Sequence, residues 1–216
     1  MHAPRAGLPD HSHFGPNGGL ITDMRVFLLR ADLERPWLGV GEGQGSVLHD
    51  VWHATKSVRS SWRPLRVERI TGDDREVIGG MPTGPLTDFP KFSFLPCFSG
   101  RAADALRDVL DANGELLPLL CDEGGFYAYH ILTQVPALDE ARSEVARILG
   151  RIAMIHRYEF LPSLLDGLTI FRLTREQGGV DLVTAPFVDR VVQAGLTGFD
   201  FREVCPAPPP HGSFEP

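Results

Sequence analysis

Two stretches decide the fold of this chain: Phe187–Val204, FVDRVVQAGLTGFDFREV, and Ser99–Leu120, SGRAADALRDVLDANGELLPLL. Each is typical of a short amphipathic helix that ends at a glycine and continues into a strand. In the first, Gly195 ends the helix, and four side chains are predicted to share one apolar face: Phe187, Val188, Val191 and Val192. In the second, Ser99 is predicted to cap the helix, and Asn113-Gly114 to end it in a left-handed turn.

Strand-like segments surround these two stretches. The predicted strands are Met24–Arg30, Trp62–Ile70, Glu115–Leu120, Phe126–Val135, Arg151–Phe160, Leu168–Leu173, Val180–Thr184 and Gly198–Val204. Phe126–Val135 is apolar on both faces, which predicts a central strand. Pro64 is expected to confine its strand to a sheet edge or to lie among its first residues. In Arg151–Phe160 the alternation predicts one shared face: Ile152, Met154, His156, Tyr158 and Phe160.

The remaining segments are predicted as loops and helices. Ala31–Asp50 is punctuated by glycines and predicts a long loop, whereas Ala137–Leu149 predicts a short helix. We therefore predict a single-domain α+β fold, with a largely antiparallel sheet and a few short helices. The predicted limits are a flexible extension over 1–23, the domain over 24–204, and a proline-rich tail over 205–216.

Composition narrows the classes of partner. The chain has 216 residues, 43% of them hydrophobic, and a net charge of −7. This acidic balance argues against nucleic-acid binding, which needs a basic surface, and is compatible with a basic protein partner. No apolar run approaches the roughly 20 residues of a membrane helix. Three cysteines without a C-x-x-C motif predict reduced thiols in a cytoplasmic protein.

His49 and His53 form the sharpest candidate for chemistry. H-x-x-x-H on a helix would place two imidazoles on one face, as a zinc site requires. Asp50 stands where a metalloprotease has its glutamate, and no third ligand follows at a familiar spacing. We therefore expect surface histidines at the end of a loop and no bound metal, with a metal-dependent hydrolase as the alternative.

Other catalytic arrangements are missing from the sequence. Cys97 lies among phenylalanines and Cys121 beside two acids, and both settings disfavour a thiolate. His130 and His156 stand in predicted strands, where a hydrogen-bonded core histidine is the expected role. No G-x-S-x-G motif occurs, and adjacent carboxylates are expected to be solvated. These features predict a protein without catalytic residues or a cofactor.

From Met24 to Val204, the chain resembles a family of bacterial immunity proteins of polymorphic toxin systems, described from a myxobacterial example. The stretches that carry the resemblance occur in the same order and at the same spacing. They are MRVFLLR, GPLTDFP, SGRAADALRDVLDANGELLPL, FYAYHILTQVPALDEARSE, LTIFRL and VTAPFVDRVVQAGLTGFDFREV. The resemblance implies a non-enzymatic protein that is made beside a toxin and binds that cognate protein toxin tightly.

Such an inhibitor needs a rigid scaffold, a complementary charge and a few anchors. The acidic turns could face a basic toxin, and the glycine-rich loop with its two tryptophans could supply contact surface. The candidate contact residues are Trp37, Trp52, Asp73, Asp74, Glu76, Asp122 and Glu123. A scaffold or interaction domain without a toxin partner is the other alternative.

Overall fold

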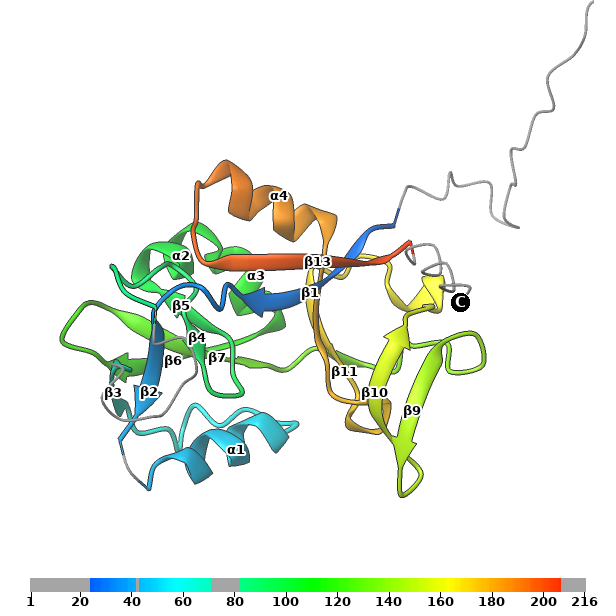
Figure 1. The fold of residues 1–216 in the computed structure, drawn as a ribbon, viewed down its shortest axis with the longest axis horizontal. Coiled ribbons are helices and arrows are strands. Elements are labelled where there is room, and N and C mark those ends of the chain that lie inside the picture. Colours follow the sequence, from blue (N-terminus) through cyan, green and yellow to red (C-terminus); the bar gives the residue numbers. More distant parts are fainter. Residues whose placement is uncertain (1–23, 42, 71–81, 207–216) are drawn as a thin grey trace, which may run out of the picture.

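Two mixed β-sheets and a layer of short helices build an α+β fold (Figure 1). The structure, a computed structural model, describes residues 24–41, 43–70 and 82–206. The five-stranded sheet has the order β13 (Phe199–Cys205), β1 (Val26–Ala31), β12 (Asp181–Thr184), β11 (Ile170–Leu173) and β8 (Gln134–Val135). The six-stranded sheet has the order β4 (Lys91–Phe92), β2 (Trp37–Val40), β3 (Leu65–Arg69), β6 (Gly114–Leu120), β7 (Phe126–Ile131) and β5 (Cys97–Ser99).

The other elements cover these sheets. The helices are α1 (Gly45–His53), α2 (Gly100–Ala105), α3 (Arg107–Asn113) and α4 (Ala185–Gln193), with 3-10 turns η2 (Pro162–Leu164) and η3 (Arg175–Gln177). A separate hairpin pairs β9 (Glu144–Ile148) with β10 (Arg151–Arg157). Within the described ranges, no helix has the length and apolar character needed to cross a membrane.

Three apolar clusters hold the layers together. In the central cluster, Phe98 and Tyr129 of the six-stranded sheet meet Phe187 of α4, with β1 and the small residues of α2 around them. A second cluster fills the space between α1 and the other face of the six-stranded sheet, and a third lies beneath the β9–β10 hairpin. Figure 1 shows α1 on the opposite side of the molecule from α2, α3 and α4.

The two stretches that decide the fold form helices and strands as expected, with three local differences. Ser99 caps α2 by accepting a hydrogen bond from the Ala102 N–H, but the predicted single helix is divided into α2 and α3 at Leu106. Gly114 is extended and begins β6, so the predicted left-handed turn is wrong. Val192 is 69% exposed and does not share the buried face, whereas Leu196, just past the end of α4, packs against the central cluster.

Two loop and helix predictions were wrong. Ala31–Asp50 is not a long loop, because β2 and most of α1 lie in it and α1 buries Leu48 and Val51 against the sheet. Ala137–Leu149 is not a helix, because the Asp139 carboxylate accepts backbone N–H groups just before β9 and so stabilises a turn.

One strand also differs from the prediction. β10 contains register shifts that break the alternation, so Met154 is 58% exposed and His156 is also exposed rather than in the core. The strand with Pro64 follows the second of its two predicted options, because Pro64 directly precedes β3, which lies inside the sheet between β2 and β6. At the ends, β13 extends to Cys205, one residue past the predicted limit, while 1–23 and 207–216 lie outside the described residues.

Gly114 allows strand β6 to approach β7 closely. A Cβ atom added at this position would meet the backbone oxygen of His130 and come within 2.7 Å of Tyr129 Oη. Both groups are fixed, since they belong to the adjacent strand and Tyr129 Oη donates to the Leu110 carbonyl at 2.8 Å. The close approach therefore explains why glycine is required where α3 meets β6.

We expect Gly114→Ala to lower the free energy of unfolding by about 1–3 kcal/mol, because two strands must separate to admit one methyl group. Urea denaturation monitored by tryptophan fluorescence measures the loss. Gly125→Ala is the matched control, since a Cβ there meets nothing within 4 Å. Equal stability of the two variants would contradict the proposed constraint.

A buried Glu115–His130 pair ties the segment after α1 to the six-stranded sheet. Glu115 Oε1 accepts the Val58 N–H at 2.7 Å, and Glu115 Oε2 accepts the Ser57 hydroxyl at 2.7 Å. His130 Nδ1 lies 3.1 Å from Glu115 Oε1, and its Nε2 lies 3.0 Å from the Ala54 carbonyl oxygen. His130 is thus the hydrogen-bonded core histidine that the sequence predicts. Burial opposes ionisation of Glu115, but these hydrogen bonds outweigh it and lower its pKa.

We expect Glu115→Gln to lower the free energy of unfolding at pH 7 by about 1–3 kcal/mol, because buried hydrogen-bonding groups lose a charged partner. The pKa of Glu115 is lowered in the fold, so its contribution is full above the ordinary value of 4.5 and is lost as the pH falls through the folded value. Denaturation from pH 7 toward acid should show the gap between wild type and variant narrowing. Glu144→Gln, at an exposed strand position, serves as the control; a gap that does not change with pH would refute the assignment.

Candidate interaction site

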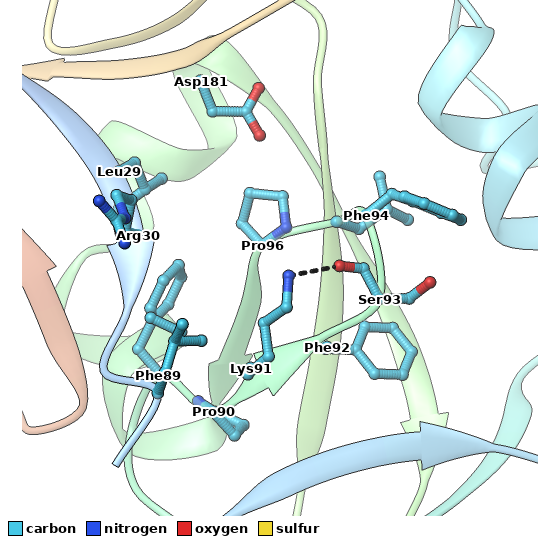
Figure 2. A pocket seen from close by; sticks show the side chains of 13 residues that line it. Leu29, Arg30, Phe89, Pro90, Lys91, Phe92, Ser93, Phe94, Pro96 and Asp181 are labelled. Atoms are coloured by element: carbon cyan, nitrogen blue, oxygen red, sulfur yellow. Dashed lines mark hydrogen bonds between the residues drawn. The ribbon is translucent and has the colours of Figure 1, made fainter. Parts of the chain in front are cut away.

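A crevice of about 270 Å³ lies between β1 and the stretch that contains β4 (Figure 2). We call it the Lys91 crevice, and its defining residues are Leu29, Arg30, Phe89, Lys91, Phe94 and Pro96. β1 brings its residues from the five-stranded sheet, while the stretch from Phe89 through β4 to Pro96 brings the others from the six-stranded sheet. The crevice therefore exists only because the two sheets are packed side by side.

Lys91 is the chemically distinctive residue of this crevice. Its Nζ donates a hydrogen bond to the Ser93 carbonyl oxygen at 2.8 Å, and no described carboxylate lies within ion-pair distance of it. Burial lowers the pKa of Lys91, and the nearby charge of Arg30 lowers that pKa further. Arg30 itself has only a loose partner, because its Nε lies 3.6 Å from Asp200 Oδ2. Two cations thus share the crevice with little compensating negative charge.

The turn after β4 projects an aromatic ring at the rim of the crevice. Ser93 has φ of 41°, a left-handed conformation that non-glycine residues rarely adopt. The next residue, Phe94, is 59% exposed, and its ring meets the edge of the His49 ring at a centroid distance of 6.4 Å. Strained backbone that displays an apolar side chain is a recurrent feature of binding sites. The turn therefore marks this rim as a candidate contact surface.

Arg172 closes the far side of a second cleft, of about 360 Å³, between the end of α1 and η3. Its guanidinium is ion-paired with Asp181, with Nη2 and Oδ2 3.1 Å apart, and Nη1 donates to the Trp52 carbonyl oxygen at 3.1 Å. The guanidinium also lies 5.5 Å from the Trp52 ring centroid. Arg172 lines the second cleft and Asp181 lines the Lys91 crevice. Their ion pair therefore separates the two hollows.

The helical placement of His49 and His53 is the opposite of the loop that was expected. The two Nε2 atoms lie 2.9 Å apart on α1, so the imidazoles do share one face. Burial lowers the pKa of His53, and Arg175 and His49 add to the effect. The described part of the chain contains no group of three or more His, Cys, Asp or Glu side chains placed to hold a metal ion. The pair therefore offers two ligands at most from these residues.

The predicted contact residues are divided between two regions. Trp37 is half-buried directly opposite Lys91 in the β2–β4 pairing, and Glu123 is ion-paired with Arg69 on the neighbouring strand. Asp122 pairs with Arg66 at 3.3 Å, so both acids of this turn have an arginine partner. Trp52 instead packs against Gly179 beside the second cleft. The other three predicted residues, Asp73, Asp74 and Glu76, lie outside the described residues.

Sequence reasoning missed the residues that line the Lys91 crevice. Arg30 lies far from Lys91 and Phe94 in the sequence, and Phe94 stands out only as one member of an apolar cluster. No motif contains any of the three. One signal was available, because Lys56 and Lys91 are the only lysines in the chain. The prediction for Cys97 is confirmed: the thiol is buried, and burial raises its pKa.

Residues 122–205 match the model of a family described as Immunity protein family (Imm11). The matched residues run from the turn before β7 to the end of β13 and include α4 and the β9–β10 hairpin. The resemblance to immunity proteins is therefore confirmed over this part of the chain. A comparison with curated proteins finds no match.

We expect Arg175→Gln to raise the pKa of His53, because a positive charge that opposes protonation of the imidazole is removed. A pH titration of the imidazole ¹³C and ¹H resonances by NMR measures the change. Arg151→Gln is the control, since Arg151 is an exposed arginine of the β9–β10 hairpin. The same shift in both variants, or none in either, would contradict a specific interaction between Arg175 and His53.

Proposed function

We propose that this protein is an immunity protein that binds a cognate bacterial toxin and neutralises it without catalysis. The match of residues 122–205 to an immunity family carries the proposal. The described residues support it in a second way, because their most distinctive hollow joins cations to apolar side chains and contains no arrangement of nucleophile and base. A binding protein needs this kind of surface, and it needs no reaction centre.

We place the protein in a bacterial polymorphic toxin system and in the cytoplasm, where an immunity protein would meet its toxin. The free thiols of Cys97 and Cys121 support the cytoplasmic assignment, since reduced thiols persist there. We assign 24–204 as the immunity-type domain, with 1–23 and 205–216 as flanking segments and Cys205 completing the last strand.

We propose that the contact surface includes Trp37, which lies opposite Lys91, and Asp122 and Glu123, which are paired with arginines of β3 in the same sheet. The net charge of −7 would attract a basic toxin over long range and speed its association. Trp52, beside the second cleft, and Asp73, Asp74 and Glu76, which lie outside the described residues, remain proposed contact residues.

Co-expression with the product of the neighbouring toxin gene tests the proposal. We expect the protein to restore growth of cells that express the toxin, and to co-purify with the toxin in a stable complex. Because the proposed action is stoichiometric binding, protection should require at least equimolar protein. Absence of both rescue and complex formation would end the proposal, and protection by trace amounts would indicate an enzyme instead.

The facing imidazoles of His49 and His53 favour one alternative, a metal-dependent hydrolase. Elemental analysis of the untagged protein distinguishes it. Stoichiometric zinc that disappears in His49→Ala and His53→Ala would support the hydrolase. The other alternative is a scaffold domain without a toxin partner. The gene neighbourhood distinguishes it: a toxin gene beside this one supports the immunity protein, and the lack of such a gene supports the scaffold domain.

A further inference from the structure

We propose that the Lys91 crevice receives an acidic side chain, Asp or Glu, of the protein partner, with an adjacent apolar side chain of that partner against Phe94. This inference rests on the proposed function, and it names the chemistry by which the partner is recognised. At this contact the charges would be the reverse of the overall ones, with the positive charge on the acidic immunity protein and the negative charge on the basic toxin.

The first argument is an incomplete ion pair. A half-buried ammonium loses hydration, and proteins normally compensate such a charge with a carboxylate. Lys91 instead has the Ser93 carbonyl oxygen, a neutral acceptor, as its hydrogen-bond partner. Asp181 lines the same crevice, but its carboxylate is occupied by Arg172. The described residues therefore leave Lys91 without a counter-ion, and an incoming carboxylate would supply one.

The second argument is the contrast between Lys91 and the other cationic side chains of the described residues. Thirteen ion pairs between arginine and an acidic residue occur among the described residues. The other described cations that have no ion pair, Lys56, Arg63, Arg151, Arg175 and Arg202, are all exposed, whereas Lys91 is half-buried and shares its hollow with Arg30. This concentration of positive charge selects a negative group, although the whole chain is acidic.

The third argument is the shape of the crevice and its rim. Its volume of about 270 Å³ is below the roughly 300–1,000 Å³ of pockets that take drug-sized ligands. One side chain fits such a space better than a cofactor does. Phe94 and Leu33, 59% and 48% exposed, line the crevice and offer apolar contact beside the cations. Contacts around an anchor that exclude water are a feature of interface hot spots, and these apolar side chains would supply such contacts around the charge pair.

The test measures the dissociation constant of the toxin complex by calorimetry with four variants. We expect Lys91→Met and Phe94→Ala each to weaken binding at least tenfold, and Lys91→Arg, which keeps the charge, to weaken it less. Lys56→Met, at the other lysine, is the matched control and should stay within twofold of wild type. Thermal unfolding of each variant shows whether it is folded. Wild-type affinity in folded Lys91→Met would overturn the inference and leave the proposed function intact.

A charge reversal identifies the partner residue. Lys91→Glu should abolish binding, and one Asp→Lys or Glu→Lys substitution on the toxin should restore it. Failure of every acidic position to restore binding would also overturn the inference. If wild type binds no toxin, the proposed function fails, and the inference fails with it.

A free carboxylate is the other source of the same chemistry. Sodium acetate and the blocked dipeptide acetyl-Glu-Leu-amide are therefore titrated against the Lys91 side-chain resonances by NMR. Tighter binding of the dipeptide supports recognition of a protein side chain. Acetate that binds as tightly as the dipeptide would instead make the crevice a small-anion site, and would overturn the inference.

Discussion

The buried guanidinium of Arg172 joins the five-stranded sheet to the helix that covers the other sheet. Arg172 is 2% exposed, and its hydrogen bonds go to Asp181 on the adjacent strand and to the last turn of α1. Removing one partner of a buried ion pair leaves a charge without compensation, at a typical cost of about 3–5 kcal/mol. Arg172 thus helps to fix the position of α1 relative to β11 and β12, together with Gln134 of β8, whose amide donates to the Ala54 carbonyl directly after α1, and it forms the wall between the two hollows.

Sequence patterns were sufficient for the parts of the fold that local chemistry determines. The Ser99 cap, the glycine that ends α4 and the buried strand β7 each follow from residues within one short window. The patterns failed where distant contacts decide. α1 forms despite Gly45 and Ser46 because Leu48 and Val51 are buried against the sheet, and Gly114 is extended because β7 lies against it. Propensity is a weak prior that such packing overrides.

The candidate site could not be predicted from sequence for the same reason. Arg30 and Lys91 belong to different sheets and meet only when those sheets pack together. By contrast, the acids chosen from the sequence, Asp122 and Glu123, are each partnered by an arginine of β3. Charges counted along the chain therefore identified an exposed turn whose acids are paired with arginines, but not Lys91, which is half-buried and has no ion pair among the described residues.

The order of the strands has a consequence for how the protein is made. β1 lies near the start of the chain, yet it sits between β13 and β12, which are close to the end. During synthesis on the ribosome, β1 therefore has no partner on either edge until nearly the whole described chain has emerged. An unpaired strand edge is a template for unwanted association. The nascent chain must consequently be protected until Cys205 completes the sheet, which makes the last strand the step that ends this vulnerable period.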